Sequence, residues 1–240
     1  DVVGNGLVAS QSGGSINVKN NAKISVAKGT EDNSYYSVVA ANGGVVSANT
    51  TKVSGLNAYG GYVSNGRTLQ LDGDIYIGAS SAANIAVDGR DGYLKGVINN
   101  SGNLELILGT GASWYNTATN VSEKDTVSHI NTLSGCNGTI YQLADSNDIT
   151  VGKYGNALGT YLNVHYTHDD SDPTKILGGN ITINNASADS EIYLVTDYDA
   201  NMNSAEVQND VLDALAHKLF YNAYVTGERN LTAVAQIAEG

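Results

Sequence analysis

The residues of this sequence that could do chemistry are mostly carboxylates and histidines in short polar turns. One set lies in Asp-Gly turns, where its members could converge as the acids of an enzyme that cleaves polysaccharides: Asp72, Asp74, Asp88 and Asp91, with Arg90. Asp is also favoured in such turns for its backbone geometry alone. We interpret these Asp residues as turn residues and expect no catalytic residues. An enzyme that cleaves polysaccharides stays open as an alternative.

Two other turns carry the oxygen and nitrogen ligands that metal ions use. Residues 197–203 place oxygen ligands at alternate positions, as a calcium loop does, but Met202 stands where glycine is wanted and Gln208 where glutamate is. A second cluster could bind a divalent ion: His165, His168, Asp169, Asp170 and Asp172. Polar turns and solvated loop charges explain both patterns, so we predict no metal site and no cofactor. Calcium binding by the Asp- and Asn-rich turns stays an open alternative.

The numbers of tyrosines and cysteines say more about function than the polar turns do. The chain has 15 tyrosines against one phenylalanine, and tyrosine is enriched at binding surfaces because its apolar ring ends in a polar group. Tyr35, Tyr36, Tyr59 and Tyr62 lie in or beside Gly- and Ser-rich turns, and we interpret them as candidate ligand-binding residues, with packing as the alternative. The single cysteine, Cys136, excludes an intramolecular disulfide and lacks an evident paired base.

Composition narrows the class of protein. A net charge of −12 weighs against a nucleic-acid partner, because phosphates require a basic face. The chain has 28 glycines but one proline, which favours ordered strands with tight turns over a disordered linker. No run is long and apolar enough to span a membrane. We expect the chain to be a piece of a longer protein, so missing targeting signals carry no weight.

The hydrophobic pattern positions these residues on strands. Apolar and β-branched runs such as residues 15–18, 74–77 and 104–108 are short, and Gly or Asn ends most of them. This pattern allows an antiparallel sandwich or barrel, or a solenoid in which each strand stacks on its counterpart one turn later. We predict the solenoid: an all-β, single-domain chain over residues 1–240, mainly β-helix over residues 1–203.

One segment has a different period. Val207, Val211, Leu215 and Leu219 follow helical spacing, Ser204 is a plausible N-cap, and Gly227 ends the segment. We predict a helix at about residues 205–224, within a helical segment 204–226, followed by a returning strand over residues 227–240. It should dock its apolar face on the strands and leave Asp210, Asp213 and Lys218 in solvent.

Several blocks resemble a known family. Residues 104–114, followed by residues 130–133, are similar to the repeated unit of pertactin-like autotransporter passenger domains. Later blocks are similar, in order, to a subset of bacterial autotransporter adhesins: residues 166–169 with 172–173, 178–183, 193–197, 209–216 with 218–219, 227–232 and 237–240. The resemblance covers about residues 100–240.

The resemblance implies a right-handed parallel β-helix, secreted across the outer membrane of a Gram-negative bacterium and displayed on the cell surface. Contact with the membrane would occur only through a C-terminal β-barrel absent from this chain. The chain lacks the Gly-Asp-Ser-Gly and Gly-Asp-Ser blocks of protease and esterase passengers. The implied function is non-enzymatic adhesion to a host or bacterial surface protein or glycan, in attachment, co-aggregation or biofilm formation. A passive stalk that spaces a distal adhesive tip from the cell is another alternative.

Overall fold

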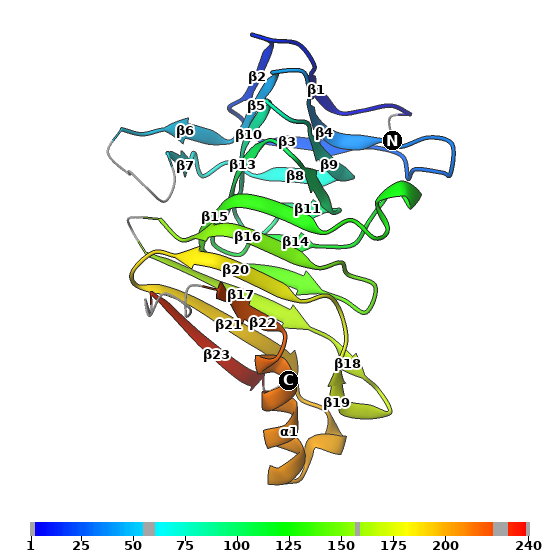
Figure 1. The fold of residues 1–240 in the computed structure, drawn as a ribbon, viewed down its shortest axis with the longest axis vertical. Helices are drawn as coiled ribbons and strands as arrows, with labels where there is room; N and C mark the ends of the chain where they lie inside the picture. The colour runs from blue at the N-terminus through cyan, green and yellow to red at the C-terminus, as the bar shows by residue number, and fades with distance from the viewer. Residues whose placement is uncertain (1–2, 55–60, 157–158, 223–229, 239–240) are drawn as a thin grey trace.

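Strands dominate the computed structural model, which describes residues 3–54, 61–156, 159–222 and 230–238. Strands account for 52% of the described residues, and α1 (Ala205–Ala216) is the only α-helix among them. Figure 1 shows the strands stacked in order from the N-terminal to the C-terminal end, where α1 lies. The protein is therefore mostly β.

The backbone is organised by ladders of parallel strands. We call the first ladder the series β2 (Ser15–Val18), β5 (Val45–Ala48), β10 (Ala82–Val87), β13 (Asn103–Leu108), β15 (Ser128–Gln142), β16 (Ile149–Tyr154), β20 (Ile181–Ala186) and β22 (Leu219–Tyr221). The second ladder is β3 (Ala22–Ser25), β8 (Leu69–Asp72), β11 (Tyr93–Lys95), β14 (Ser113–Tyr115), β15, β17 (Thr160–Tyr166), β21 (Ser190–Asp197) and β23 (Leu231–Ala238). A smaller parallel sheet contains β1 (Leu7–Ala9), β4 (Tyr36–Ala40), β9 (Asp74–Ile77) and β12 (Ile98–Asn100).

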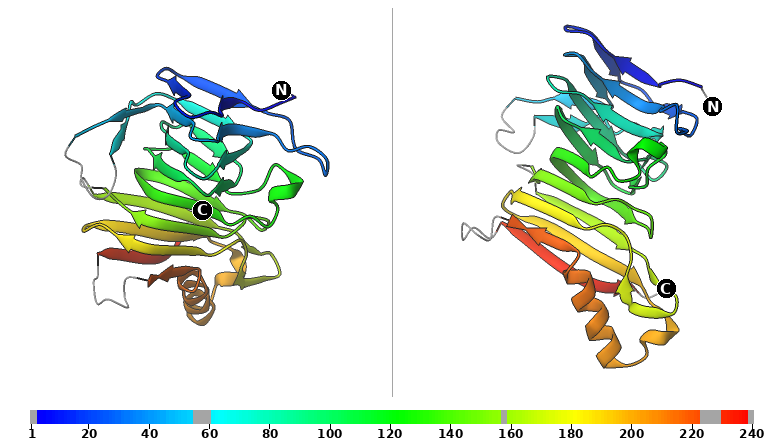
Figure 2. Two further views of the ribbon diagram at one scale, coloured as in Figure 1. Left: turned by 45° about the horizontal axis from the view of Figure 1, so that its top comes forward. Right: turned by 45° about the vertical axis from the view of Figure 1, so that its right-hand side comes forward.

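The two long ladders are one sheet. Strand β15 pairs with β13 and β16 through its first half and with β14 and β17 through its second half, which joins both ladders into a 15-stranded sheet that curls nearly closed. Apart from the pairs of the long strand β15 with β14 and β16, partners within a ladder are not consecutive strands: β13 pairs with β10 and β15, not with β12 or β14. Figure 2 shows the ladders on different sides of the stack. The prediction of stacked parallel strands is confirmed at this level.

The core runs lengthwise between the ladders. Equivalent positions of the second ladder form one interior row whose members are all buried: Leu71, Leu94, Trp114, Ile140, Val164 and Leu194. Fully burying such a side chain contributes about 1.5–3 kcal/mol. Trp114 lies inside this row, and its Nε1 donates to the Gly96 carbonyl at 2.9 Å.

Two short hairpins depart from the parallel arrangement. Strand β6 (Thr50–Lys52) pairs antiparallel with β7 (Tyr62–Ser64), and β18 (His168–Asp169) pairs antiparallel with β19 (Asp172–Ile176). The β6–β7 hairpin is an insertion between β5 and β8 and projects sideways from the stack in Figure 1. The predicted stacking of parallel strands therefore does not extend to these two hairpins.

The helix is shorter than the sequence predicts. Ser204 caps it as expected, its Oγ accepting the Val207 N–H at 3.1 Å, but α1 ends at Ala216. Leu219–Tyr221 is β22, which pairs with β20. The helical spacing of Leu219 is overridden because the edge of β20 offers backbone hydrogen bonds that would otherwise stay unmade.

The predicted faces of the helix are only partly correct. Val211 and Leu215 are buried, while Asp210 and Asp213 are exposed, as expected. Lys218 does not lie in solvent: it is half-buried, and its Nζ donates to the Gly178 carbonyl at 2.7 Å. Of the predicted returning strand, the described part is β23, and residues 223–229 and 239–240 lie outside the described residues. No helix of the described part could span a membrane.

Candidate functional site: a groove along the stacked corners

A groove of about 620 Å³ runs along one edge of the stack. We call a corner the connection from a strand of the first ladder to the next strand of the second. The corner groove is lined by residues from successive corners and from the inserted hairpin: Tyr62, Val63, Ser64, Asp88, Ile107, Gly109, Thr110, Gly135, Cys136, Asn156, Gly159, Thr160, Tyr161, Asp189 and Glu191. Because the ladders stack the corners, residues far apart in sequence share one surface.

The floor of the groove requires glycine at two places. Gly135, at the bend of β15, has φ +152°, and a Cβ there would lie 1.9 Å from the Leu108 carbonyl oxygen. A Cβ on Gly109 would lie 2.2 Å from a carboxylate oxygen of Asp88. Side chains at these positions would clash with the neighbouring layer, so the glycines allow the corners to pack closely and keep the floor open.

The β6–β7 hairpin forms one wall, and polar contacts hold it. Ser64 Oγ donates to Asp88 Oδ2 at 2.6 Å, and the Gly61 and Tyr62 N–H groups donate to the Glu105 carboxylate at 3.1 and 3.0 Å. At the base of the hairpin, Asn49 Oδ1 accepts the N–H of Arg67 at 3.0 Å. The wall is thus attached to the stack at several points.

The opposite part of the groove carries carboxylates and a second tyrosine. Asp189 is exposed, and Glu191 accepts a hydrogen bond from the Tyr193 hydroxyl at 2.6 Å. Tyr161 is 39% exposed, and contact with the Cys136 side chain raises the pKa of its hydroxyl. The groove therefore presents tyrosine rings beside hydrogen-bond acceptors, the combination that typically holds polar ligands with apolar faces.

The structure brings together three residues that the sequence singled out for different reasons. Tyr62, Asp88 and Cys136 all line the corner groove. Sequence reasoning missed Tyr161, Asp189 and Glu191. A tyrosine at the start of a strand-like run and an Asp at a turn were the only signals. Neither of them indicates a groove unless the stacking of the corners is known.

The other candidate tyrosines lie apart from the groove. The Tyr36 hydroxyl donates to Glu123 Oε1 at 2.7 Å, and its ring packs against Tyr76 with centroids 5.6 Å apart. Burial, together with Glu123, raises the pKa of Tyr36. The backbone of Tyr35 is held by the Asn120 amide, with both hydrogen bonds at 2.8 Å. Tyr59 lies outside the described residues.

The carboxylates considered as an alternative catalytic set do not converge. Asp74 is fully buried and accepts hydrogen bonds from the backbone of Val97 and Asn120, so it serves the fold. Asp88 lines the corner groove, whereas Asp91 belongs to a separate shallow hollow beside Lys23. Asp72 lies half-buried in β8, and Arg90 is exposed.

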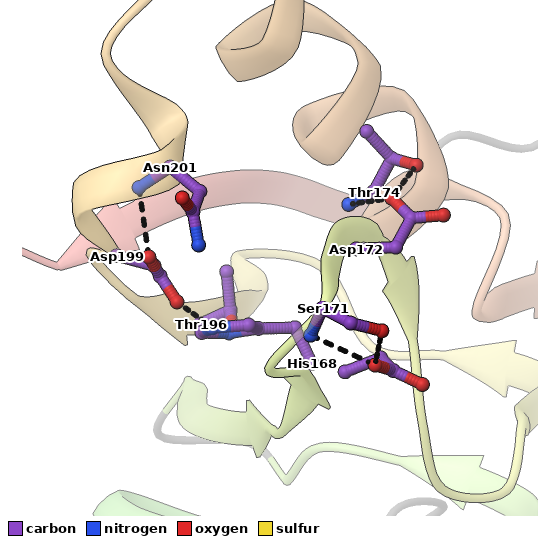
Figure 3. A network of polar contacts seen from close by, with 8 residues as sticks. His168, Ser171, Asp172, Thr174, Thr196, Asp199 and Asn201 are labelled. Atoms are coloured by element: carbon purple, nitrogen blue, oxygen red, sulfur yellow. Dashed lines mark hydrogen bonds and ion pairs between the residues drawn. The ribbon is translucent and has the colours of Figure 1, made fainter.

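The histidine and aspartate turns form a polar network near the C-terminal end of the stack (Figure 3). His168 lies 3.2 Å from both Thr196 Oγ1 and Asp199 Oδ2, and Asp199 Oδ1 accepts the Asn201 N–H at 2.8 Å. Two of the three carboxylates of the β18–β19 hairpin accept local hydrogen bonds: Asp169 accepts from Ser171, and Asp172 from Thr174. The third, Asp170, is exposed.

These turns do not assemble a metal site in the part of the chain that the structure describes. Over those residues, no group of three or more His, Cys, Asp or Glu side chains is placed to hold a metal ion. The network ties the β18–β19 hairpin to the segment before α1, which is a structural role.

The fold and the groove together define a mostly β protein whose parallel sheet carries a groove lined by tyrosines, carboxylates and apolar groups. No protein-family model, no curated protein and no solved structure matches the chain.

Proposed function

We propose that the chain is a right-handed parallel β-helix from the passenger region of a Gram-negative autotransporter adhesin, displayed on the cell surface. In this proposal the corner groove binds a host or bacterial surface ligand, a glycan or a protein, in attachment or biofilm formation. The observation that carries the proposal is the groove itself, in which Tyr62 and Tyr161 stand among polar groups supplied by successive corners.

The parallel ladders support the β-helix. Each ladder strand pairs with strands one circuit of the chain away, as the register of β13 with β10 and β15 illustrates. Such stacking supplies backbone hydrogen bonds from layer to layer without disulfides and makes a stiff support for a surface ligand site. The sequence blocks similar to autotransporter passengers agree with this arrangement.

The layout of the groove supports binding of an elongated ligand. Its lining residues run from Asp88 through Thr110 and Cys136 to Asp189, so the groove crosses the strands and follows the stack. With neighbouring strands about 4.8 Å apart, a groove over several layers extends on the order of 15–20 Å. A chain of sugars or an extended peptide segment fits such a shape.

A polysaccharide-processing enzyme is the second candidate, and the carboxylates Asp88, Asp189 and Glu191 favour it. Against it, Asp88 already accepts hydrogen bonds from Ser64 and from the Gly89 N–H, and Glu191 accepts one from Tyr193. The lining residues include no Lys, Arg or His, so the groove lacks the base that a polysaccharide lyase would use. Release of products from neutral or uronic-acid polysaccharides that disappears in Asp88→Asn or Glu191→Gln would establish the enzyme and overturn our proposal.

The binding function is tested with purified chain on fixed epithelial cells and on Gram-negative bacteria. Tyr62→Ala and Tyr161→Ala should each reduce bound protein by about tenfold, the effect of losing an aromatic anchor. Tyr198→Ala is the matched control, because Tyr198 is 43% exposed against 39% for Tyr161 and lies outside the groove. Equal binding by all variants would reject the groove as the ligand site, and no binding by the unsubstituted chain would favour the passive stalk.

A further inference from the structure

The outer face of β13 carries a buried carboxylate. Leu104, Leu106 and Leu108 point into the core and are fully buried. The alternate residues Glu105 and Ile107 face outward, yet they are only 8% and 7% exposed. The β6–β7 hairpin contacts β10 and β13 and covers this face. Outward residues of a solvated sheet would be exposed, so the hairpin is docked on the sheet at this point.

Glu105 makes the contact that fixes the position of β7. Its Oε2 accepts the Gly61 N–H at 3.1 Å and its Oε1 accepts the Tyr62 N–H at 3.0 Å. One carboxylate thus binds two consecutive backbone donors, and the second of these residues provides a tyrosine that lines the corner groove. Charge-assisted hydrogen bonds of this kind are roughly twice as strong as neutral ones.

We infer that Glu105 is a positioning residue: its carboxylate latches β7 to the stack and so holds Tyr62 as the wall of the corner groove. This inference rests on the proposed binding function of the groove. The residue touches no ligand itself and acts through Tyr62.

Packing alone does not explain a carboxylate at position 105. Burial raises the pKa of Glu105, since desolvation disfavours its charged form. The partners that the described structure gives the carboxylate are the two hairpin N–H groups, with no cation beside it. An apolar side chain such as that of Ile107 would pack on the same face without this cost. What the carboxylate adds is a fixed hydrogen-bonded position for the hairpin.

Three substitutions differ in the hydrogen-bond acceptors that they leave for the hairpin. Glu105→Gln keeps one acceptor oxygen, but its NH₂ group cannot accept the second backbone N–H, so the latch is half lost. Glu105→Ala loses both contacts. Glu123→Gln is the matched control, because Glu123 is also a buried glutamate, 4% exposed, but its partners are Tyr36, Asn99 and Thr126, which do not line the groove.

Two readouts follow the latch without any ligand. The first is hydrogen exchange of the amides in residues 61–64. The second is the rate at which a bulky maleimide modifies Cys136, the only cysteine of the chain, which is exposed and lines the same groove. Loss of a charge-assisted contact should speed amide exchange by about tenfold or more. In Glu105→Gln and Glu105→Ala the rate of Cys136 modification should change as well.

The latch predicts that the amides of residues 61–64 exchange fastest in Glu105→Ala, more slowly in Glu105→Gln and slowest in the unsubstituted chain. In Glu123→Gln they should exchange at the rate of the unsubstituted chain. Unchanged exchange at residues 61–64 in Glu105→Ala would overturn the latch. Should Glu105→Ala fail to fold, Glu105→Gln decides by the same measure.

Binding to fixed epithelial cells and bacteria completes the experiment. Loss of binding in Glu105→Gln together with faster exchange supports the positioning role, whereas faster exchange with full binding contradicts it. Absence of binding by the unsubstituted chain would reject the proposed function, while the exchange data would still decide on the latch.

Discussion

The rings of Tyr115 and Tyr141 lie face to face, with centroids 4.7 Å apart and planes 7° apart. The two residues are register partners in β14 and β15, and their separation equals the usual distance between neighbouring strands, about 4.7–4.9 Å. His165, the next member of the row, tilts against Tyr141 at 5.5 Å. Because the stacked rings cover each other's faces, they stabilise the ladder and leave little face for a sugar ring.

Substitution of Tyr141 tests this structural role. Tyr141→Ala should lower the free energy of unfolding by about 0.5–1.5 kcal/mol for the lost stack, beyond the apolar area it exposes. Tyr141→Phe keeps the stack and should remain near the unsubstituted chain in urea unfolding. Equal destabilisation by both variants would show that the hydroxyl, and not the stack, matters.

Part of the fold is predictable from local sequence patterns, because the backbone conformation of a short segment depends on its own residues. Short β-branched runs ended by Gly or Asn indicate the strands, and Ser204 indicates the start of α1. The end of α1 is not predictable in this way. Leu219 continues the helical spacing, and only the unpaired edge of β20 draws it into β22.

The composition of the groove depends on which corners stack on one another. No local sequence pattern predicts this stacking. Asp88, Cys136 and Asp189 become neighbours only because each layer adds one corner above the last. Tyr62 could be singled out from its Gly-rich surroundings, but its role depends on Glu105, more than forty residues further along the chain. Tyr36 could be singled out in the same way, from its Ser-containing surroundings, and instead packs against Tyr76.

The helix should stabilise the C-terminal end of the stack. Leu215 is fully buried, so Leu215→Ala should cost about 2–5 kcal/mol in the free energy of unfolding. Asp213 is exposed, and Asp213→Ala should stay within about 0.5 kcal/mol. Urea unfolding of both variants checks this. An unchanged unfolding midpoint in Leu215→Ala, with loss of cell binding, would make the helix the recognition element instead.

Asp74 should be a structural carboxylate. It is fully buried and accepts the N–H groups of Val97, Thr119 and Asn120 at 2.9, 3.0 and 2.7 Å. Asp74→Ala should cost about 1–3 kcal/mol for each buried donor left without an acceptor. Urea unfolding at neutral pH measures this, and a loss below about 1 kcal/mol in total would contradict the role.

The pH dependence of the same variant has a defined sign. Burial raises the pKa of Asp74 above its ordinary value of 3.8, so the native state takes up this proton more readily than the unfolded chain. The stability advantage of the unsubstituted chain over Asp74→Ala should therefore grow as the pH falls toward 3.8 and shrink as the pH rises through the folded-state pKa. A difference that shrinks on acidification would contradict this.

Asp199 should show the opposite sign. The Asn201 N–H, and after it His168, lower the pKa of Asp199 below 3.8, so its stabilising effect is present above that value and lost as the pH falls through the folded-state pKa. The difference in unfolding free energy between the unsubstituted chain and Asp199→Asn should be present above pH 3.8 and vanish in acid. Acid unfolding curves of the two proteins measure it, and a difference that persists in acid would count against the network of Figure 3.

The central claim is that the corner groove binds a surface ligand, and the single cysteine allows a direct measurement. Cys136 lines the groove and is exposed, so a bulky maleimide on its thiol fills the groove, whereas a methylthio group adds little volume. Bound protein on fixed epithelial cells and on Gram-negative bacteria is compared for the two adducts and for a Cys136→Ser chain treated with the same maleimide. We expect the bulky adduct to abolish binding and the methylthio adduct and the treated Cys136→Ser chain to bind fully. Full binding by the bulky adduct would contradict the claim.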